Sequence, residues 1–252
     1  MKPYEYLQNF DVKYYESDFK DEIKISTVLA YLEEVACASA DELGFGYSYI
    51  RERGYAFVVS GICVEFHRTI AQGEHICVST WPTPPTHVVF GREYRLCGIH
   101  GEVLANASSR WCMLDKNTGK ILSSKLLVEQ DYSTYNKAKA LENVAWKLPA
   151  MDKNKAKECF VITIANSEYD HNFHVNNTRY ADYCMNVFTI AELAKKCLKR
   201  FTICYQKQCY EGETLRFYRF ETDKNVYLVC GNNEREETVV QAEIVFTEKD
   251  NA

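Results

Sequence analysis

The chain has 252 residues and a formal net charge of −5, with 46% hydrophobic and 26% charged residues. This length allows one large or two small domains with a sizeable core, and the composition is that of an ordinary folded protein. No run of five like charges occurs, which excludes an acidic tail and argues against a nucleic-acid partner. No apolar run approaches the roughly 18 residues that a membrane span needs, so no membrane partner is expected.

Eleven cysteines are scattered along the chain without a Cys-x-x-Cys pair. The first residues show no charged segment followed by an apolar one, as a secretory leader would. Both features predict a cytoplasmic protein with reduced thiols.

The first part of the chain predicts one helix followed by strands. A helix is expected over 26–43, with Ser26 as N-cap and with apolar or small residues at helical spacing. Alternating strands are predicted at 57–66, 75–81 and 103–111, with Gly73 at a turn. The helical positions are Val28, Leu29, Leu32, Val35, Ala36 and Ser39.

The segment 131–151 lacks strand alternation and is rich in Lys, Asn and Ala. It is expected to link a first domain, 1–130, to a second domain, 152–252, with a helical piece at 136–143. Its apolar Trp146 and Leu148 predict that part of the linker lies against the core.

The second part repeats the first. A helix is expected over 177–199, and strands over 204–209, 214–220 and 238–246, with Gly212 at the turn. One helix on one antiparallel sheet buries only one sheet face, so two such halves packed together explain the length. The predicted fold is α+β, a double hotdog.

Polar residues precede the second helix: Asp170, His171, Asn172, His174, Asn176 and Asn177. They are aimed at a helix N-terminus, where unpaired N–H groups and the positive dipole end polarise a carbonyl or hold an anion. A shift of 149 residues pairs Asp170 with Asp21 but places Ile23 and Ile25 at the positions of Asn172 and His174. Catalysis is therefore expected in the second half.

Asp170 and His174 are candidate bases, and backbone N–H groups at the helix start are candidate oxyanion donors. The competing interpretation is that Asp170 and Asn172 only cap the helix while His174 is a buried structural residue. His171 and His174 have a spacing seen in metal sites, but nothing nearby completes a site and no metal is expected. No Gly-x-Ser-x-Gly occurs, which disfavours a serine α/β-hydrolase.

A family resemblance rests on Asp-x-Asn-x-His-Val-Asn-Asn at 170–177, followed by a Tyr. In the first half, Leu-Ala-Tyr-Leu-Glu-Glu at 29–34, Trp-Pro at 81–82, Ala-Ser-Ser-Arg-Trp at 107–111 and Leu-Asp-Lys-Asn-Thr-Gly-Lys-Ile at 114–121 follow in the same order. From about Tyr14 to Thr247 the chain resembles the acyl-acyl carrier protein (acyl-ACP) thioesterases of the bacterial branch, and more distantly the plant plastid enzymes.

The resemblance implies roles for Asp170, Asn172 and His174. His174 would bind or deprotonate water, Asp170 would orient it or share that function, and Asn172 would fix the geometry or bind the carbonyl. Where the plant enzymes carry Glu-Cys, this chain has Gln208 and Cys209 on a presumed strand. A glutamine cannot act as a base, so Gln208 is expected to hold water, and Cys209 is interpreted as a buried thiol rather than a nucleophile.

The resemblance also implies hydrolysis of fatty acyl-ACP, with water as second substrate and no cofactor. Asn176 and Asn177 would help to bind the substrate, and the first half would form an apolar channel for the acyl tail, with Leu29, Leu32, Val58 and Trp81 as candidate walls. An acyl-CoA thioesterase and a hotdog module that binds acyl thioesters without turnover stay open, as does a monomer or homodimer. A basic cluster is either a solvated helix face or a docking patch for the acidic carrier protein; its members are Lys195, Lys196, Lys199 and Arg200.

Overall fold

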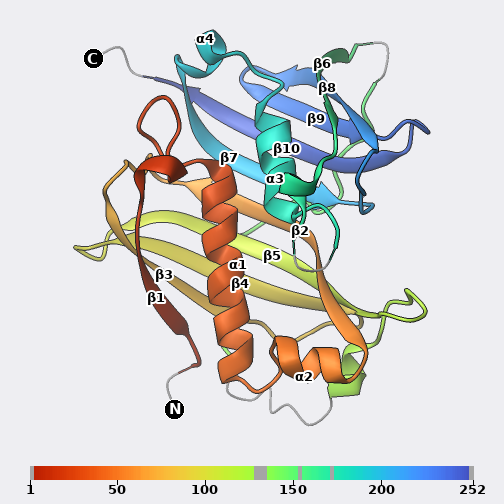
Figure 1. Cartoon of the computed structure of the whole chain (residues 1–252). Coiled ribbons are helices and arrows are strands. Elements are labelled where there is room, and N and C mark those ends of the chain that lie inside the picture. Colours follow the sequence, from red (N-terminus) through yellow and green to blue (C-terminus); the bar gives the residue numbers. More distant parts are fainter. Residues whose placement is uncertain (1–2, 128–134, 153–154, 171–172, 250–252) are drawn as a thin grey trace.

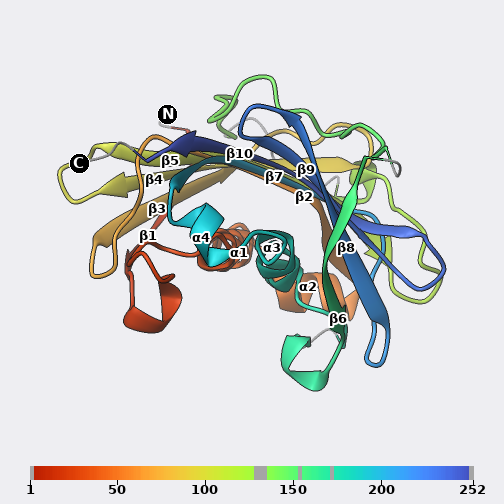
Figure 2. The ribbon, with the colours of Figure 1, turned by 90° about the horizontal axis from the view of Figure 1, so that it is seen from above.

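The computed structural model describes residues 3–127, 135–152, 155–170 and 173–249. In these residues, one antiparallel sheet curves around two central helices, α1 (Ile25–Glu42) and α3 (Asn177–Met185), which lie side by side (Figures 1 and 2). Two shorter helices are α2 (Tyr47–Glu52) and α4 (Ile190–Leu193). The strands are β1 (Tyr6–Asp11), β2 (Tyr55–Phe66), β3 (His75–Pro82), β4 (Val89–Gly98), β5 (Val103–Asp115), β6 (Lys157–Thr163), β7 (Lys196–Tyr205), β8 (Thr214–Asp223), β9 (Val226–Asn232) and β10 (Thr238–Glu248).

The order of the strands repeats. The sheet runs β1-β3-β4-β5-β2 and continues β7-β10-β9-β8-β6, so each half uses its five strands in the same relative order. The halves meet where β2 pairs antiparallel with β7, with Ile62 opposite Ile203. The predicted double hotdog is confirmed, with the two halves joined as one continuous sheet.

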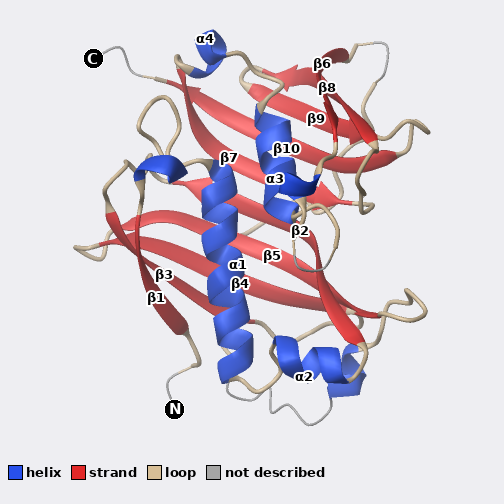
Figure 3. Cartoon of the chain, in the orientation of Figure 1, coloured by secondary structure: helices blue, strands red, loops and turns tan. Residues whose placement is uncertain are grey.

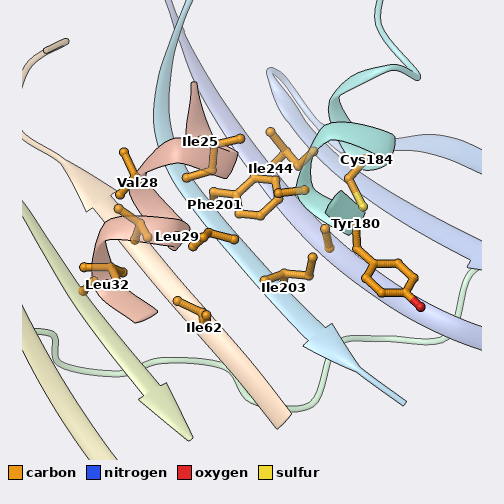
Figure 4. Packing of buried hydrophobic residues seen from close by; sticks show 14 of the residues in the cluster. Ile25, Val28, Leu29, Leu32, Ile62, Tyr180, Cys184, Phe201, Ile203 and Ile244 are labelled. Atoms are coloured by element: carbon orange, nitrogen blue, oxygen red, sulfur yellow. The ribbon is translucent and has the colours of Figure 1, made fainter. Parts of the chain in front are cut away.

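The main core lies between the sheet and the central helices. Alternate side chains of β2 and β7 point to this face, and the helix stripes cover them. Each fully buried large side chain contributes roughly 1.5–3 kcal/mol to folding. Figure 4 shows this junction, with Ile25, Val28, Leu29 and Leu32 of α1, Ile62 of β2, Phe201 and Ile203 of β7, Ile244 of β10, and Tyr180 and Cys184 of α3.

The linker runs over the opposite face of the sheet (Figure 2, green). Leu148 packs with Cys204 and Leu228, and a Cβ atom at Gly61 would lie 3.1 Å from the ring of Trp146. The prediction that these linker residues pack against the core is confirmed. The helical piece predicted at 136–143 was wrong, because sheet side chains bind this backbone: Trp81 donates to Ala138 O, and Ala140 N donates to the Glu93 carboxylate.

The helix predicted over 177–199 was also wrong in length. It ends at Met185, a separate capped turn forms α4, and β7 already begins at Lys196 (Figure 3). Phe201 and Ile203 are two residues apart and both buried in the main core. This alternation is typical of a strand, so the segment joins the sheet rather than extending the helix. β7 ends at Tyr205, so most of the strand predicted at 204–209 is irregular, and β1, β4, β6 and β9 had not been predicted.

The turn glycines Gly73 and Gly212 both have positive φ, as predicted for turns. Within the described part of the chain, no helix is long and apolar enough to cross a membrane.

Candidate active site

A tight loop leads into α3. Tyr169 and Val175 form an isolated antiparallel β-bridge, and the amide of Asp170 donates to the carbonyl of His174 at 3.0 Å. Phe173 has a φ of 62° and is 82% exposed. This loop closes on itself and brings the Asp170 and His174 side chains together. The predicted Asn172 lies outside the described residues.

The imidazole of His174 is held in one orientation. Its Nδ1 lies 3.1 Å from the carbonyl oxygen of Val175 and 3.7 Å from Asp170 Oδ2. A carbonyl oxygen only accepts, so Nδ1 carries a hydrogen, and in the neutral ring Nε2 keeps the lone pair. The carboxylate and the carbonyl thereby leave Nε2 as the basic atom.

The N-terminus of α3 presents backbone donors beside this pair. Asn176 is the N-cap, and its side-chain oxygen accepts from the amide of Thr178 at 2.8 Å. The amide of Asn177 makes no hydrogen bond within the described residues, as the first amides of a helix lack intrahelical partners. The side-chain oxygen of Asn177 is buried and without a partner there, while its carbonyl accepts from Tyr205.

Gln208 and Cys209 lie in the irregular segment after β7. Gln208 is exposed, and its side-chain oxygen accepts from the hydroxyl of Tyr210. Cys209 is 1% exposed, its carbonyl accepts from the amide of Val175, and burial raises the pKa of its thiol to about 11. This disfavours a thiolate at neutral pH and supports the packing role.

A cavity of about 390 Å³ lies beside α1 in the first half. Its wall is mainly apolar and comes from α1, α2 and the strands β2, β4 and β5; it includes Ala36, Phe45, Ile50, Phe57, Phe90 and Trp111. Such a cavity suits an aliphatic chain.

The four wall residues expected from sequence do not line this cavity. Leu29 and Leu32 are buried at the junction of the halves, nearer the start of α1 (Figure 4). Val58 follows the cavity residue Phe57 on a strand and therefore points to the other face. Trp81 likewise faces the linker.

Glu33 connects the cavity to the loop before α3, and sequence reasoning missed it. It lines the cavity, and burial together with the nearby Asp170 carboxylate raises its pKa to about 7. Glu33 also helps to raise the pKa of Tyr205. The available signal was its position on the helix, four residues after Leu29 and three before Ala36, on the edge of the apolar stripe.

The basic cluster does not form a helix face. Lys196, Lys199 and Arg200 lie on β7 and bind neighbouring strands: Lys199 donates to the carbonyl of Phe66 at 2.8 Å, and Arg200 pairs with Glu65 at 3.3 Å. A docking patch on the active-site helix is therefore not formed by these residues.

The repeat register expected from sequence was also wrong. The bridge Ser17–Ile23 is the first-half counterpart of Tyr169–Val175, which sets the shift at 152 residues rather than 149. Asp170 then corresponds to Asp18 and His174 to Glu22, so polar residues rather than isoleucines occupy the equivalent loop.

No group of three His, Cys, Asp or Glu side chains in the described ranges is placed to hold a metal ion.

Comparison with known families and structures agrees with this arrangement. The model of the acyl-ACP thioesterase N-terminal domain matches residues 3–133, and that of the C-terminal domain matches residues 151–248. A palmitoyl-ACP thioesterase of Gossypium hirsutum chloroplasts is 26% identical over 230 residues, 87% of this chain and 56% of that protein. An Arabidopsis thaliana palmitoyl-ACP thioesterase is 27% identical, covering 84% and 54%. The chain thus spans about half the length of these plant relatives.

Two solved structures share the fold. An acyl-ACP thioesterase of Bacteroides thetaiotaomicron superposes with a TM-score of 0.88 at 22% identity, covering 96% of this chain and 98% of that one. The 12:0-ACP thioesterase of Umbellularia californica gives 0.87 at 17% identity, covering 97% and 98%. The two family models together take in both halves of the sheet and both central helices. The chain therefore belongs to the acyl-ACP thioesterase family.

Proposed function

We propose that this chain hydrolyses the thioester between a fatty acyl group and the phosphopantetheine arm of acyl carrier protein. The observation that carries the proposal is the Asp170–His174 pair at the N-terminus of α3, linked through Glu33 to the apolar cavity. Family membership and the named activities of the relatives support the reaction and the carrier.

The acyl tail would occupy the first-half cavity, with the thioester carbonyl at the start of α3. There the amide of Asn177 and the positive end of the helix would stabilise the oxyanion; losing one such donor typically costs ~10²–10³ in rate. Asn172 and the side-chain oxygen of Asn177 would hold the carbonyl or the water. In this scheme the expected first domain, 1–130, supplies the acyl pocket, and the expected second domain, 152–252, supplies the reaction centre.

His174 Nε2 would bind the attacking water, and Asp170 would hold the imidazole through Nδ1. The water oxygen attacks the thioester carbon, a tetrahedral oxyanion forms, and the carbon–sulfur bond breaks. The proton lost by the water ends on the sulfur, so the products are a fatty acid and the free thiol of the carrier. Water is the second substrate, and this scheme requires no cofactor.

Two alternatives have a specific basis. Because Lys199 and Arg200 bind neighbouring strands, they do not favour acyl carrier protein over CoA, and CoA is the competing carrier. The exposed Gln208, at the position of the family carboxylate, favours a module that binds acyl thioesters without turnover.

One turnover assay separates these three functions. The purified chain is given the same medium and long acyl groups on acyl carrier protein and on CoA, and release of free thiol is followed. We expect turnover with a higher kcat/KM for the carrier protein. A preference for acyl-CoA would establish the rival enzyme, and tight binding with no thiol release would establish the binding module.

A further inference from the structure

Glu33 is a partly buried carboxylate in the wall of an apolar cavity. Its side chain has no ion pair and no hydrogen bond within the described residues. It is also the only acidic side chain among the described residues that line this cavity. An uncompensated carboxylate in such a place destabilises the folded state, so its presence calls for a functional explanation.

The surroundings of Glu33 belong to the reaction centre. α1 and α3 pack side by side and run in opposite directions, and the start of α3 lies beside the first half of α1 (Figure 1). Asp170 and Tyr205 both interact electrostatically with Glu33, and the Tyr205 hydroxyl donates to the carbonyl of Asn177 at 3.1 Å. Glu33 thus lines the acyl cavity and also interacts with two residues next to the start of α3.

The two residues at the position of the family Glu-Cys pair supply no proton acceptor. Gln208 occupies the position of a family carboxylate, but an amide accepts no proton at neutral pH, and this side chain is exposed and bound to Tyr210. Cys209 is a buried thiol. Glu33 can provide a carboxylate from the opposite half.

The geometry points to Glu33 as a catalytic residue of the thioester hydrolysis, contributed to the second-half site by the first half. This inference rests on the proposed function. The Glu33 carboxylate accepts the proton of the water as the water oxygen bonds to the thioester carbon. When the carbon–sulfur bond breaks, the same proton passes to the departing sulfur, and the carboxylate is regenerated with no other co-reactant.

Burial places the pKa of Glu33 near neutral pH, with smaller contributions from neighbouring charges. Burial is the main cause that raises its pKa to about 7, and the carboxylates of Asp170 and Glu34 raise it further. Tyr205 of β7 and Cys37 of α1 also interact with it, and Arg92 of β4 lines the same cavity. A base is most effective when its pKa lies near the working pH. Because the ionised form is the active one, rate should be lost as pH falls below about 7.

The test compares the whole wild-type chain with E33Q, E33D, the neighbouring control E34Q and the site variant D170N, on one long-chain acyl-ACP from pH 5.5 to 8.5. We expect E33Q to lose at least ~10² in kcat, the lower range for general-base help. The kcat of E33Q should also no longer fall as the pH drops below about 7. E33D should recover part of the rate, and its kcat should again fall at low pH. E34Q should keep the wild-type kcat at pH 8.

Thermal unfolding separates chemistry from folding. A carboxyl whose pKa is raised by folding destabilises the native state increasingly as pH rises from about 4.5 to about 7, and fully above that. E33Q should therefore raise Tm at pH 8 and raise it less at pH 5. A structural role predicts the reverse, a lower Tm together with the lost rate, and that result would overturn the assignment.

The same variants separate a failure of the Glu33 role from a failure of the proposed thioesterase function. If wild type exceeds D170N while E33Q equals wild type with an unchanged pH profile, only the role of Glu33 is refuted. If wild type and D170N release thiol equally slowly, the proposed function fails, and the role of Glu33 fails with it.

Discussion

The loops at 18–22 and 170–174 are closed by the same backbone hydrogen bond but differ in chemistry. In each, the first amide donates to the fifth carbonyl, Asp18 to Glu22 and Asp170 to His174, and the fourth residue has positive φ. Each loop is preceded by a short 3₁₀ turn and followed by a central helix. The repeat therefore builds the same approach to a helix N-terminus twice.

The side chains make the two loops different. In the first loop, the ammonium of Lys20 lies 2.6 Å from Glu22 and 3.9 Å from Asp18, so the polar groups neutralise one another. In the second, Asp170 and His174 face each other, and α3 then begins with Asn177 where α1 begins with Ile25. Symmetry of the backbone thus supplies the helix dipole in both halves, while the second loop, unlike the first, carries an imidazole.

The largest effects are expected from substitutions at matched positions of the two loops, which test whether only the second loop takes part in catalysis. We expect His174→Ala and Asp170→Asn each to lower kcat at least ~10²-fold, because the attacking water loses the imidazole that binds it or the carboxylate that holds this imidazole. Glu22→Gln and Asp18→Asn should leave kcat within a factor of about two. The measurement is steady-state turnover of acyl-ACP.

Thermal unfolding serves as the control for these four variants. Glu22→Gln should lower Tm, because the Lys20 ammonium, whose side chain is only 11% exposed, loses its nearer partner. If Glu22→Gln or Asp18→Asn abolished turnover in a folded protein, the first loop would share the site and the asymmetry would be wrong.

A smaller effect is expected at the two helix N-caps. Asn176 caps α3 with its side chain, whereas Lys24 makes no side-chain cap bond for α1. Asn176→Ala should reduce the free energy of unfolding by ~1 kcal/mol, and Lys24→Ala by clearly less. Urea denaturation at pH 7 gives both values; equal losses would mean that the Asn176 side chain contributes no capping energy.

The smallest effect concerns the positive-φ residues. Phe173 has φ 62° and Asp21 has φ 57°. An L-residue with a Cβ is strained there by roughly 1–2 kcal/mol, and Asp tolerates the region better than Phe. Phe173→Gly should therefore raise the free energy of unfolding by up to ~1 kcal/mol and Asp21→Gly by less. A loss of stability at Phe173 would show that its exposed ring makes a contact worth more than the strain.

Sequence reasoning identified the double repeat, the first central helix to within one residue at each end, and the polar segment before the second helix. These features are local: helical spacing over 26–43, alternation in the strands, and N-cap residues leave a signal in neighbouring positions. The division into halves also follows, since a helix on one sheet needs a partner surface.

Tertiary structure decided what depends on distant partners. The segment after Met185 contains both helical and alternating patterns, and pairing of Lys196–Tyr205 with β2 and β10 selects the strand. The repeat register needed the matching bridges, because short polar loops align equally well three residues apart. The meeting of Glu33 with Asp170, 137 residues later, has no sequence signal at all, since it arises only when two helices from different halves pack side by side.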